Sequence, residues 1–168
     1  ISIAAQTGSQ ATVVYKKATG ETKAVVLDVN TSTTFTPGTV KQIDATTGGS
    51  GTALTRMSST QLLAVYQGTS GQTPKMRVLD IVSSAVNESA EVAADATACA
   101  ATYMRAGTLS STKALVVFRN NSGNRLQLRL QTISGSTPAP SGSVLDLAAM
   151  PGTSPSLQFG LVIMSASR

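Results

Sequence analysis

Apolar and polar residues alternate along residues 75–81, which predicts a β-strand. The two faces of that strand would carry Met76, Val78 and Asp80 on one side, and Arg77, Leu79 and Ile81 on the other. Residues 62–66 are apolar at nearly every position. A strand that is apolar on both faces is typical of a layer covered on both sides. Residues 75–81 therefore predict a strand with one face in solvent, and residues 62–66 predict a strand buried between two layers.

The same pair of stretches occurs three times along the chain. Residues 63–66 and 75–81 correspond to residues 115–118 and 127–133, and a first copy lies at residues 12–15 and 24–29. The spacing between copies is 51 or 52 residues, and the turns between the paired strands carry Gly20, Gly71 and Gly123 at the same spacing. A hairpin turn needs a residue that tolerates positive φ, which glycine supplies. The sequence is therefore a tandem repeat.

Each unit contains four short strand-like pieces, which in the second copy lie around residues 53–56, 62–66, 75–81 and 90–94. Four strands in about 52 residues is the content of one β-propeller blade. The sequence therefore predicts an all-β fold of tandem four-stranded antiparallel repeats, a β-propeller or partial propeller, with a β-sandwich or a linear β-repeat array as alternatives. We expect one repeat domain, residues 1–168, with units at 1–51, 52–102 and 103–149 and a partial unit at 150–168.

The units carry Ser-Ser-Thr before Leu-Val-Val-Phe-Arg (residues 115–119), and then Leu-Arg-Leu-Gln-Thr-Ile-Ser-Gly (residues 128–135). In this they resemble the diverse β-propeller repeats of large secreted or surface proteins. The Trp-Asp and Gly-His signatures of WD40 blades, the kelch pattern and the Asp-rich calcium loops of integrin-like blades are absent from the sequence. The resemblance implies a rigid extracellular repeat module.

Residues 1–3 align with residues 52–54 and would open a unit, whereas residues 161–163 match a second strand. Three full units and part of a fourth do not make a closed ring by themselves. We expect the residues to be a fragment of a longer chain, or to be completed by partner copies, because an open stack exposes apolar faces and strand edges.

Tyr15, Tyr66 and Phe118 occupy equivalent positions in the three copies. Large repeat aromatics usually fill the space between neighbouring units. We expect this packing role for all three, in preference to a platform on which a ligand stacks.

The composition restricts the possible chemistry. The chain has no His and one Cys, so it cannot form a Ser-His-Asp or Cys-His nucleophile, a His-ligated metal site or an internal disulfide. Its 21 Ser and 23 Thr favour strands joined by polar turns. No apolar run approaches the roughly 20 residues of a membrane-spanning helix. We expect a protein that is not an enzyme, without cofactor and without a membrane span.

The formal net charge of +5 is unevenly distributed. Bases and acids cancel over residues 1–98, and the excess lies in the C-terminal part, where Asp146 alone opposes Arg105, Lys113, Arg119, Arg125, Arg129 and Arg168. These bases are single, spaced and without neighbouring aromatic residues, which is unlike a nucleic-acid surface. We expect a solvated face, with polyanion binding as the alternative.

Five aspartates recur at equivalent positions in the units. One Asp per repeat at a fixed position usually caps a turn or binds backbone amides, so we expect structural roles rather than acid–base chemistry or calcium binding. The third unit places Gln131 where the second has Asp80. Cys99 lies among small apolar residues and is expected to be a buried thiol. The recurring residues are Asp28 with Asp80, and Asp44 with Asp95 and Asp146.

Three acceptor patterns for N-linked glycan begin at Asn30, Asn87 and Asn120. All three are expected in turns, where a glycan projects outward. In a eukaryotic source we expect glycan on at least one of them.

These observations favour a non-catalytic extracellular or surface module, a building block of a filament, coat, fibre or adhesive assembly whose partners are proteins or further repeats. The alternative is a carbohydrate-binding, lectin-like propeller. The absence of Trp and the presence of only three Tyr leave few rings on which a sugar could stack.

Overall fold

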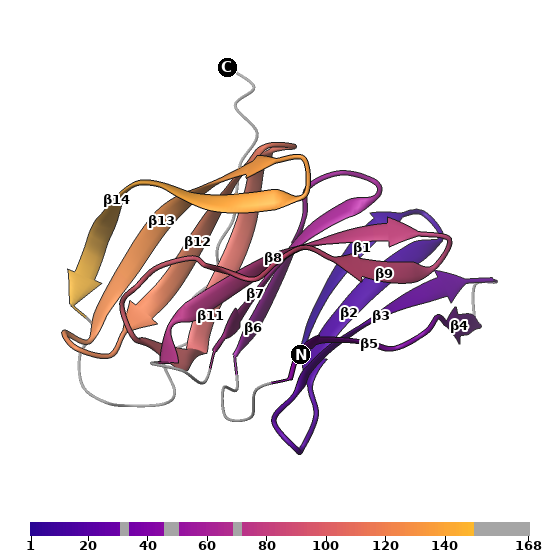
Figure 1. Cartoon of the computed structure of the whole chain (residues 1–168), viewed down its shortest axis with the longest axis horizontal. Helices are drawn as coiled ribbons and strands as arrows, with labels where there is room; N and C mark the ends of the chain where they lie inside the picture. Colours follow the sequence, from indigo (N-terminus) through magenta and orange to yellow (C-terminus); the bar gives the residue numbers. More distant parts are fainter. Residues whose placement is uncertain (31–33, 46–50, 69–71, 150–168) are drawn as a thin grey trace.

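The computed structural model describes residues 1–30, 34–45, 51–68 and 72–149. The regular elements in this part of the chain are all strands, and they form three antiparallel sheets of four to five strands that follow one another in chain order (Figure 1). The described strands form no closed barrel or ring. The fold is therefore an open, repeat-like all-β array.

Each sheet begins with three strands in sequential order and ends with fourth-strand segments that pair with the third strand. The first sheet contains β1 (Ser2–Thr7), β2 (Gln10–Lys16), β3 (Thr22–Val29), β4 (Phe35–Pro37) and β5 (Lys41–Asp44). The second sheet contains β6 (Thr52–Arg56), β7 (Gln61–Gln67), β8 (Pro74–Val82), β9 (Ala85–Glu88) and β10 (Val92–Ala93). The third sheet contains β11 (Cys99–Ser110), β12 (Lys113–Asn120), β13 (Arg125–Ser134) and β14 (Thr137–Ala149).

The pairing register confirms the repeat seen in the sequence. In the central hairpins, Thr12 lies opposite Val26, Leu63 opposite Val78, and Leu115 opposite Leu130. These partners are separated by the same 51 or 52 residues that relate the sequence copies. The three hairpins are therefore built on one pattern.

The fourth strand differs between the units. In the first sheet β4 pairs with the end of β3 and β5 with its beginning, and β9 and β10 divide β8 in the same way. In the third sheet β14 is continuous, with a register shift near Gly142, whose φ is +69°. The expected four strands per unit are therefore found in the third sheet, whereas the first two sheets contain five. The third sheet also begins at Cys99, before the expected unit boundary at residue 103.

The core lies between the sheets, in two separate apolar clusters. One cluster joins Val14, Ala24 and Val26 of the first sheet to Tyr66 and Leu79 of the second. The other packs the opposite face of the second sheet against the third and includes Leu63, Val65, Met76, Val116 and Phe118. The second sheet is thus covered on both faces.

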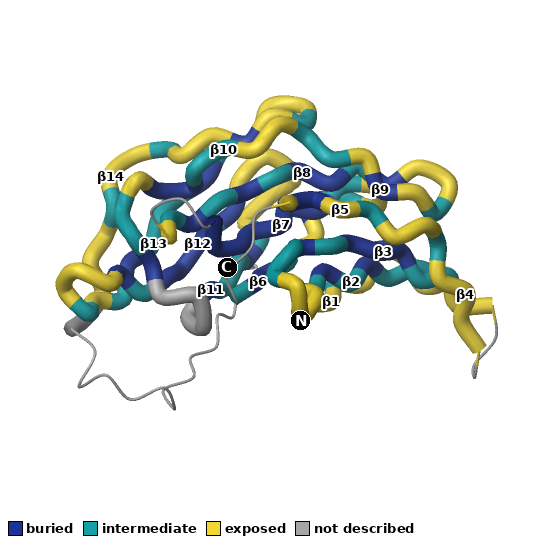
Figure 2. The backbone as a smooth tube through the Cα atoms, turned by 60° about the horizontal axis from the view of Figure 1, so that its bottom comes forward, coloured by how far each residue is buried: buried dark blue, intermediate teal, exposed yellow. Residues whose placement is uncertain are grey.

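The structure confirms the sandwiched strand. Residues 62–66 of β7 are all fully buried, and in Figure 2 the neighbouring β8 alternates between buried and intermediate residues. Successive side chains of a strand point to opposite faces. Leu63 and Val65 therefore contact the third sheet, while Leu62, Ala64 and Tyr66 contact the first.

The three equivalent aromatic residues do not share one environment. Tyr66 and Phe118 are fully buried and belong to the two inter-sheet clusters. Tyr15 is only half-buried, because its neighbour Val14 faces the second sheet and Tyr15 points to the opposite side. The packing role expected for all three is confirmed for Tyr66 and Phe118, and is wrong for Tyr15 within the described residues.

Polar contacts hold the first sheet to the second at several points. Ser2 Oγ donates a hydrogen bond of 2.7 Å to the carbonyl oxygen of Thr52. Gly38 approaches the hairpin between β8 and β9 so closely that a Cβ atom on it would lie 2.3 Å from the carbonyl oxygen of Ser84. A real Cβ atom does not approach an oxygen so closely, so only glycine fits here.

We expect Phe118→Ala to lower the free energy of unfolding by about 3–5 kcal/mol, because it empties a fully buried site between two sheets. Tyr15→Ala, at the equivalent position of the first sheet, should cost much less, because its ring is already partly in water. Equilibrium urea unfolding in dilute solution, followed by circular dichroism, measures both. Equal losses for the two variants would contradict the different environments of the two rings.

Candidate binding site at the first strands of the sheets

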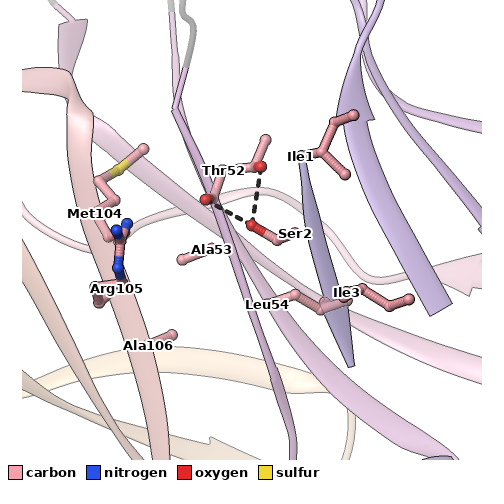
Figure 3. A pocket seen from close by; sticks show the side chains of 9 residues that line it. All are labelled: Ile1, Ser2, Ile3, Thr52, Ala53, Leu54, Met104, Arg105 and Ala106. Carbon is pink, nitrogen blue, oxygen red and sulfur yellow. Dashed lines mark hydrogen bonds between the residues drawn. The ribbon is translucent and has the colours of Figure 1, made fainter. Parts of the chain in front are cut away.

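The first strands of the three sheets together line a hollow of about 290 Å³ (Figure 3). Each strand contributes three consecutive residues: residues 1–3 at the start of β1, residues 52–54 of β6 and residues 104–106 of β11. These segments are spaced by 51 and 52 residues. The hollow is therefore a product of the repeat, because equivalent positions of successive sheets meet around it.

The polar groups of the hollow come from Ser2, Thr52 and Arg105. Ser2 Oγ lies 3.1 Å from Thr52 Oγ1, in addition to its bond to the Thr52 carbonyl (Figure 3). Arg105 is the only charged residue among the nine that line the hollow, and its Nη1 donates a 2.7 Å hydrogen bond to the carbonyl oxygen of Met104. A guanidinium and hydroxyl groups that line one hollow can bind an anionic or hydroxyl-bearing small molecule.

Sequence reasoning aligned residues 1–3 with residues 52–54 but did not predict this hollow. The signal was present in the spacing of the segments, since equivalent residues of neighbouring repeats lie side by side. None of the nine residues suggests a site by its own type.

Two of the recurring aspartates bridge neighbouring sheets. In the first sheet, Gln10 Nε2 donates to Asp28 Oδ1 at 2.7 Å and lies 3.4 Å from Ser84 Oγ in the turn between β8 and β9. Hydrogen bonds from Ser84 and Gln10 lower the pKa of Asp28. These contacts fix the first sheet to a turn of the second.

The second sheet repeats the arrangement. Gln61 Nε2 donates to Asp80 Oδ1 at 2.9 Å and to the carbonyl oxygen of Gly135 at 3.1 Å, and Ser136 Oγ bonds to Asp80 Oδ2. In the third sheet the equivalent pair is Lys113 opposite Thr132.

The alignment of Gln131 with Asp80 is therefore wrong by one residue. The pairing register places Thr132 at the position of Asp80, and Gln131 points to the other face.

The other aspartates lie in the fourth-strand region of their units. Asp95 Oδ1 accepts a 2.7 Å hydrogen bond from the backbone nitrogen of Thr97, and Asp95 forms an ion pair with Arg129 of the third sheet. Asp146 pairs with Arg125 at 3.1 Å in a half-exposed position. Asp44 is buried at the end of β5. Asp95 thus combines a turn contact with a bond between two sheets.

The environment of Asp95 shifts its titration. Burial alone raises the pKa of a carboxyl group, but hydrogen bonds from Thr97 and the Arg129 guanidinium outweigh this and leave the pKa of Asp95 lowered. The side chain of Asp95 is 3% exposed. Its ionised form is therefore stabilised by folding.

Cys99 lies in the cluster between the second and third sheets, and its Sγ donates to the carbonyl oxygen of Gln72 at 3.1 Å. Burial raises the pKa of Cys99 to about 12. A thiol with such a pKa is almost entirely protonated at neutral pH and is a poor nucleophile. The expected buried thiol is confirmed.

The hydroxyl group of Tyr66 is satisfied at the edge of the other cluster. It donates to Glu91 Oε2 at 2.7 Å and accepts from Arg77 Nε at 3.0 Å, and Lys75 lies 3.5 Å from Glu91 Oε1. Burial, together with Glu91, raises the pKa of Tyr66. The polar end of this core residue is thus held in a local charge network.

The C-terminal bases separate into two groups. Arg129 and Arg125 pair with aspartates, whereas the register places Arg105, Lys113 and Arg119 on one face of the third sheet, alternating with apolar residues. Arg168 lies outside the described residues.

The three glycosylation patterns differ in accessibility. Asn30 follows β3 and is exposed, and Asn87 is exposed on β9. Asn120 ends β12 and is 9% exposed, and its Oδ1 accepts hydrogen bonds from the backbone nitrogens of Ser122 and Gly123. The expectation that all three lie in turns is therefore wrong for Asn87, which lies in β9, and for Asn120, the last residue of β12. The Asn120 side chain already binds backbone nitrogens of the following turn.

No group of three or more His, Cys, Asp or Glu side chains that could hold a metal ion occurs within residues 1–30, 34–45, 51–68 and 72–149. The described part of the chain also contains no helix long and apolar enough to cross a membrane. No protein-family model, curated protein or solved structure matches this chain.

We expect Asp95→Asn to lower the free energy of unfolding at neutral pH by about 1–3 kcal/mol, because the charged hydrogen bond to Arg129 is lost. The folded pKa of Asp95 is lowered, so its contribution is present above the unfolded pKa of about 3.9 and disappears as the pH falls through the folded value. The difference between wild type and variant should shrink between about pH 5 and pH 2. Urea unfolding across that range measures it.

Asp146→Asn is the matched control, since it removes the equivalent carboxylate in a half-exposed pair. Its expected cost is below about 1 kcal/mol at every pH. A gap for Asp95→Asn that does not change with pH would argue against its ion pair with Arg129.

Expression in a secreting eukaryotic host should add glycan at Asn30 or Asn87 and not at Asn120, because only the first two are exposed. Intact-mass measurement with the single Asn→Gln variants identifies the sites. A chain with the mass of the bare polypeptide, or glycan at Asn120 alone, would refute this expectation.

Proposed function

We propose that this chain is a non-catalytic structural and interaction module, a partial β-propeller that forms part of a larger chain or assembly outside the cell or on its surface. The observation that carries the proposal is the threefold use of one sheet pattern, with successive sheets packed face to face and equivalent residues of their first strands around one hollow.

The arrangement of the sheets favours propeller blades over a β-sandwich. A sandwich buries one face of each of two sheets, whereas here the second sheet is buried on both faces. The hollow supports blades over a linear array, since the inner strands of propeller blades surround a central channel. The shared hollow of residues 1–3, 52–54 and 104–106 is consistent with part of such a channel.

The use of the polar residues supports a structural role. Asp28, Asp80 and Asp95 bind groups of a neighbouring sheet, and the Cys99 thiol is buried and protonated. A general acid, base or nucleophile must reach a substrate. The contacts of Asp28, Asp80 and Asp95 with neighbouring sheets therefore support a structural role for these three carboxylates.

A location outside the cell is supported by the exposed Asn30 and Asn87 within glycosylation patterns and by the hydroxyl-rich sequence. These residues favour a surface in contact with water and with other polymers.

Carbohydrate binding is the second candidate, and the hollow is the observation that favours it. Hydroxyl groups of Ser2 and Thr52 and the Arg105 guanidinium are suited to sugar hydroxyls or carboxylates. The lining contains no aromatic ring for stacking, so we place this function second.

Protease treatment of intact cells or particles of the source tests the surface location. We expect peptides of this chain to be released and identified by mass spectrometry while a marker protein from the interior stays intact. Release only after lysis would overturn the proposed location.

A glycan array separates the two candidate functions. Under the structural proposal no glycan binds reproducibly. Reproducible binding that Arg105→Gln abolishes, with Arg125→Gln as the control outside the hollow, would establish the lectin function instead.

A further inference from the structure

The two outermost sheets each carry an apolar face that neither inter-sheet cluster includes. On the first sheet this face contains Ile3, Val13, Tyr15 and Leu27, which we call the Tyr15 face. On the third sheet it contains Leu115, Val117, Leu128, Leu130 and Leu145, which we call the Leu128 face, and Arg105, Lys113 and Arg119 lie on the same face. Alternation along the strands fixes both assignments, because Val14 and Phe118 point into the clusters.

Both faces carry apolar side chains that are partly open to water. On the first sheet, Ile3 is 63% exposed and Tyr15 is half-buried. On the third sheet, Leu145 is 57% exposed and Leu128 and Leu130 are half-buried. Apolar faces of this kind on a folded chain usually mark contacts with another protein surface.

The internal interfaces show which face fits which. The Leu128 face corresponds residue for residue to the face of the second sheet formed by Leu63, Val65, Met76 and Val78, since these positions precede Leu115, Val117, Leu128 and Leu130 by 52 residues. In the second sheet that face is covered by the Phe118-bearing face of the next sheet.

The Tyr15 face corresponds in the same way to the faces that bear Tyr66 and Phe118. Within the chain, each of those faces covers the preceding sheet. The Tyr15 face therefore has the pattern of a face that packs onto the preceding sheet. The Leu128 face has the pattern of a face onto which the following sheet packs.

We propose that the Leu128 face of one copy packs against the Tyr15 face of a second copy, head to tail, in the manner of the interface between the second and third sheets. This inference rests on the proposed blade array. A second copy supplies both members of the pair, since it carries a covering face on its first sheet and a face to be covered on its third.

Contacts of this kind are heterologous, so they close into a ring or extend as a fibre, depending on the rotation between copies. Two copies hold six of these sheets, within the range of four to eight blades known for propellers. A ring of two copies would have both Leu128 faces and both Tyr15 faces covered.

Sedimentation equilibrium of the full chain, from low micromolar to near-millimolar concentration, tests the proposal. We expect wild type to associate into species of twice the 17.1 kDa chain mass or larger. A monomer at all concentrations would overturn the head-to-tail contact. Surface exposure of the chain in the protease experiment would then still stand, so the failure would not be confused with failure of the proposed function.

Two variants identify the faces. Ile3→Lys places a charge on the Tyr15 face and Leu145→Lys places one on the Leu128 face, and both residues are more than half exposed, so the fold should be kept. Each should weaken self-association by about tenfold or more, because a charge is buried against an apolar surface. Val82→Lys, also 57% exposed but outside both faces, is the matched control and should associate as wild type.

Mixing the two variants gives the decisive result. In a head-to-tail contact, Leu145→Lys still has an intact Tyr15 face and Ile3→Lys an intact Leu128 face, so an equimolar mixture should form a heterodimer at concentrations at which each variant alone is monomeric. Lack of a heterodimer, or weakening by Val82→Lys equal to that of the other two, would refute the proposed contact. Circular dichroism spectra matching wild type confirm that the variants are folded.

Discussion

Face-to-face packing of sheets is the interaction on which this molecule depends. A single four-stranded sheet of about fifty residues has two sides and little interior, so its apolar residues leave water only against another sheet. Here the second sheet has neighbours on both sides and contains the fully buried residues 62–66. The outer sheets have one packed face each. The hydrogen bonds of Asp28 and Asp80 and the ion pair of Asp95 with Arg129 then fix how the sheets are aligned.

The sequence was sufficient to predict the strands and the repeat, because alternation and a constant spacing are direct consequences of sheet geometry. The sandwiched strand could be read from its continuous apolar run. The divided fourth strand could not, since its segments are short and pair only with the third strand of their sheet. The alignment of Gln131 with Asp80 was wrong because the spacing varies between 51 and 52, and one residue of slip moves a side chain to the opposite face.

The candidate site was harder to predict than the fold. Ser2, Thr52 and Arg105 are ordinary residues of three different strands, and they acquire a shared role only because the first strands of successive sheets meet. The aromatic positions show the same limit. Tyr15 and Tyr66 are the same residue at the same point of the repeat, yet only Tyr66 has a sheet on its face. Position in the stack, which no local pattern encodes, decides the environment.

The thiol of Cys99 can report separation of the second sheet from the third. The thiol is enclosed between the second and third sheets, and the sequence holds no other cysteine. A thiol-specific reagent therefore reacts with the native protein only in the rare moments when these two sheets part. The labelling rate therefore measures how often the second and third sheets separate, and no further cysteine has to be introduced.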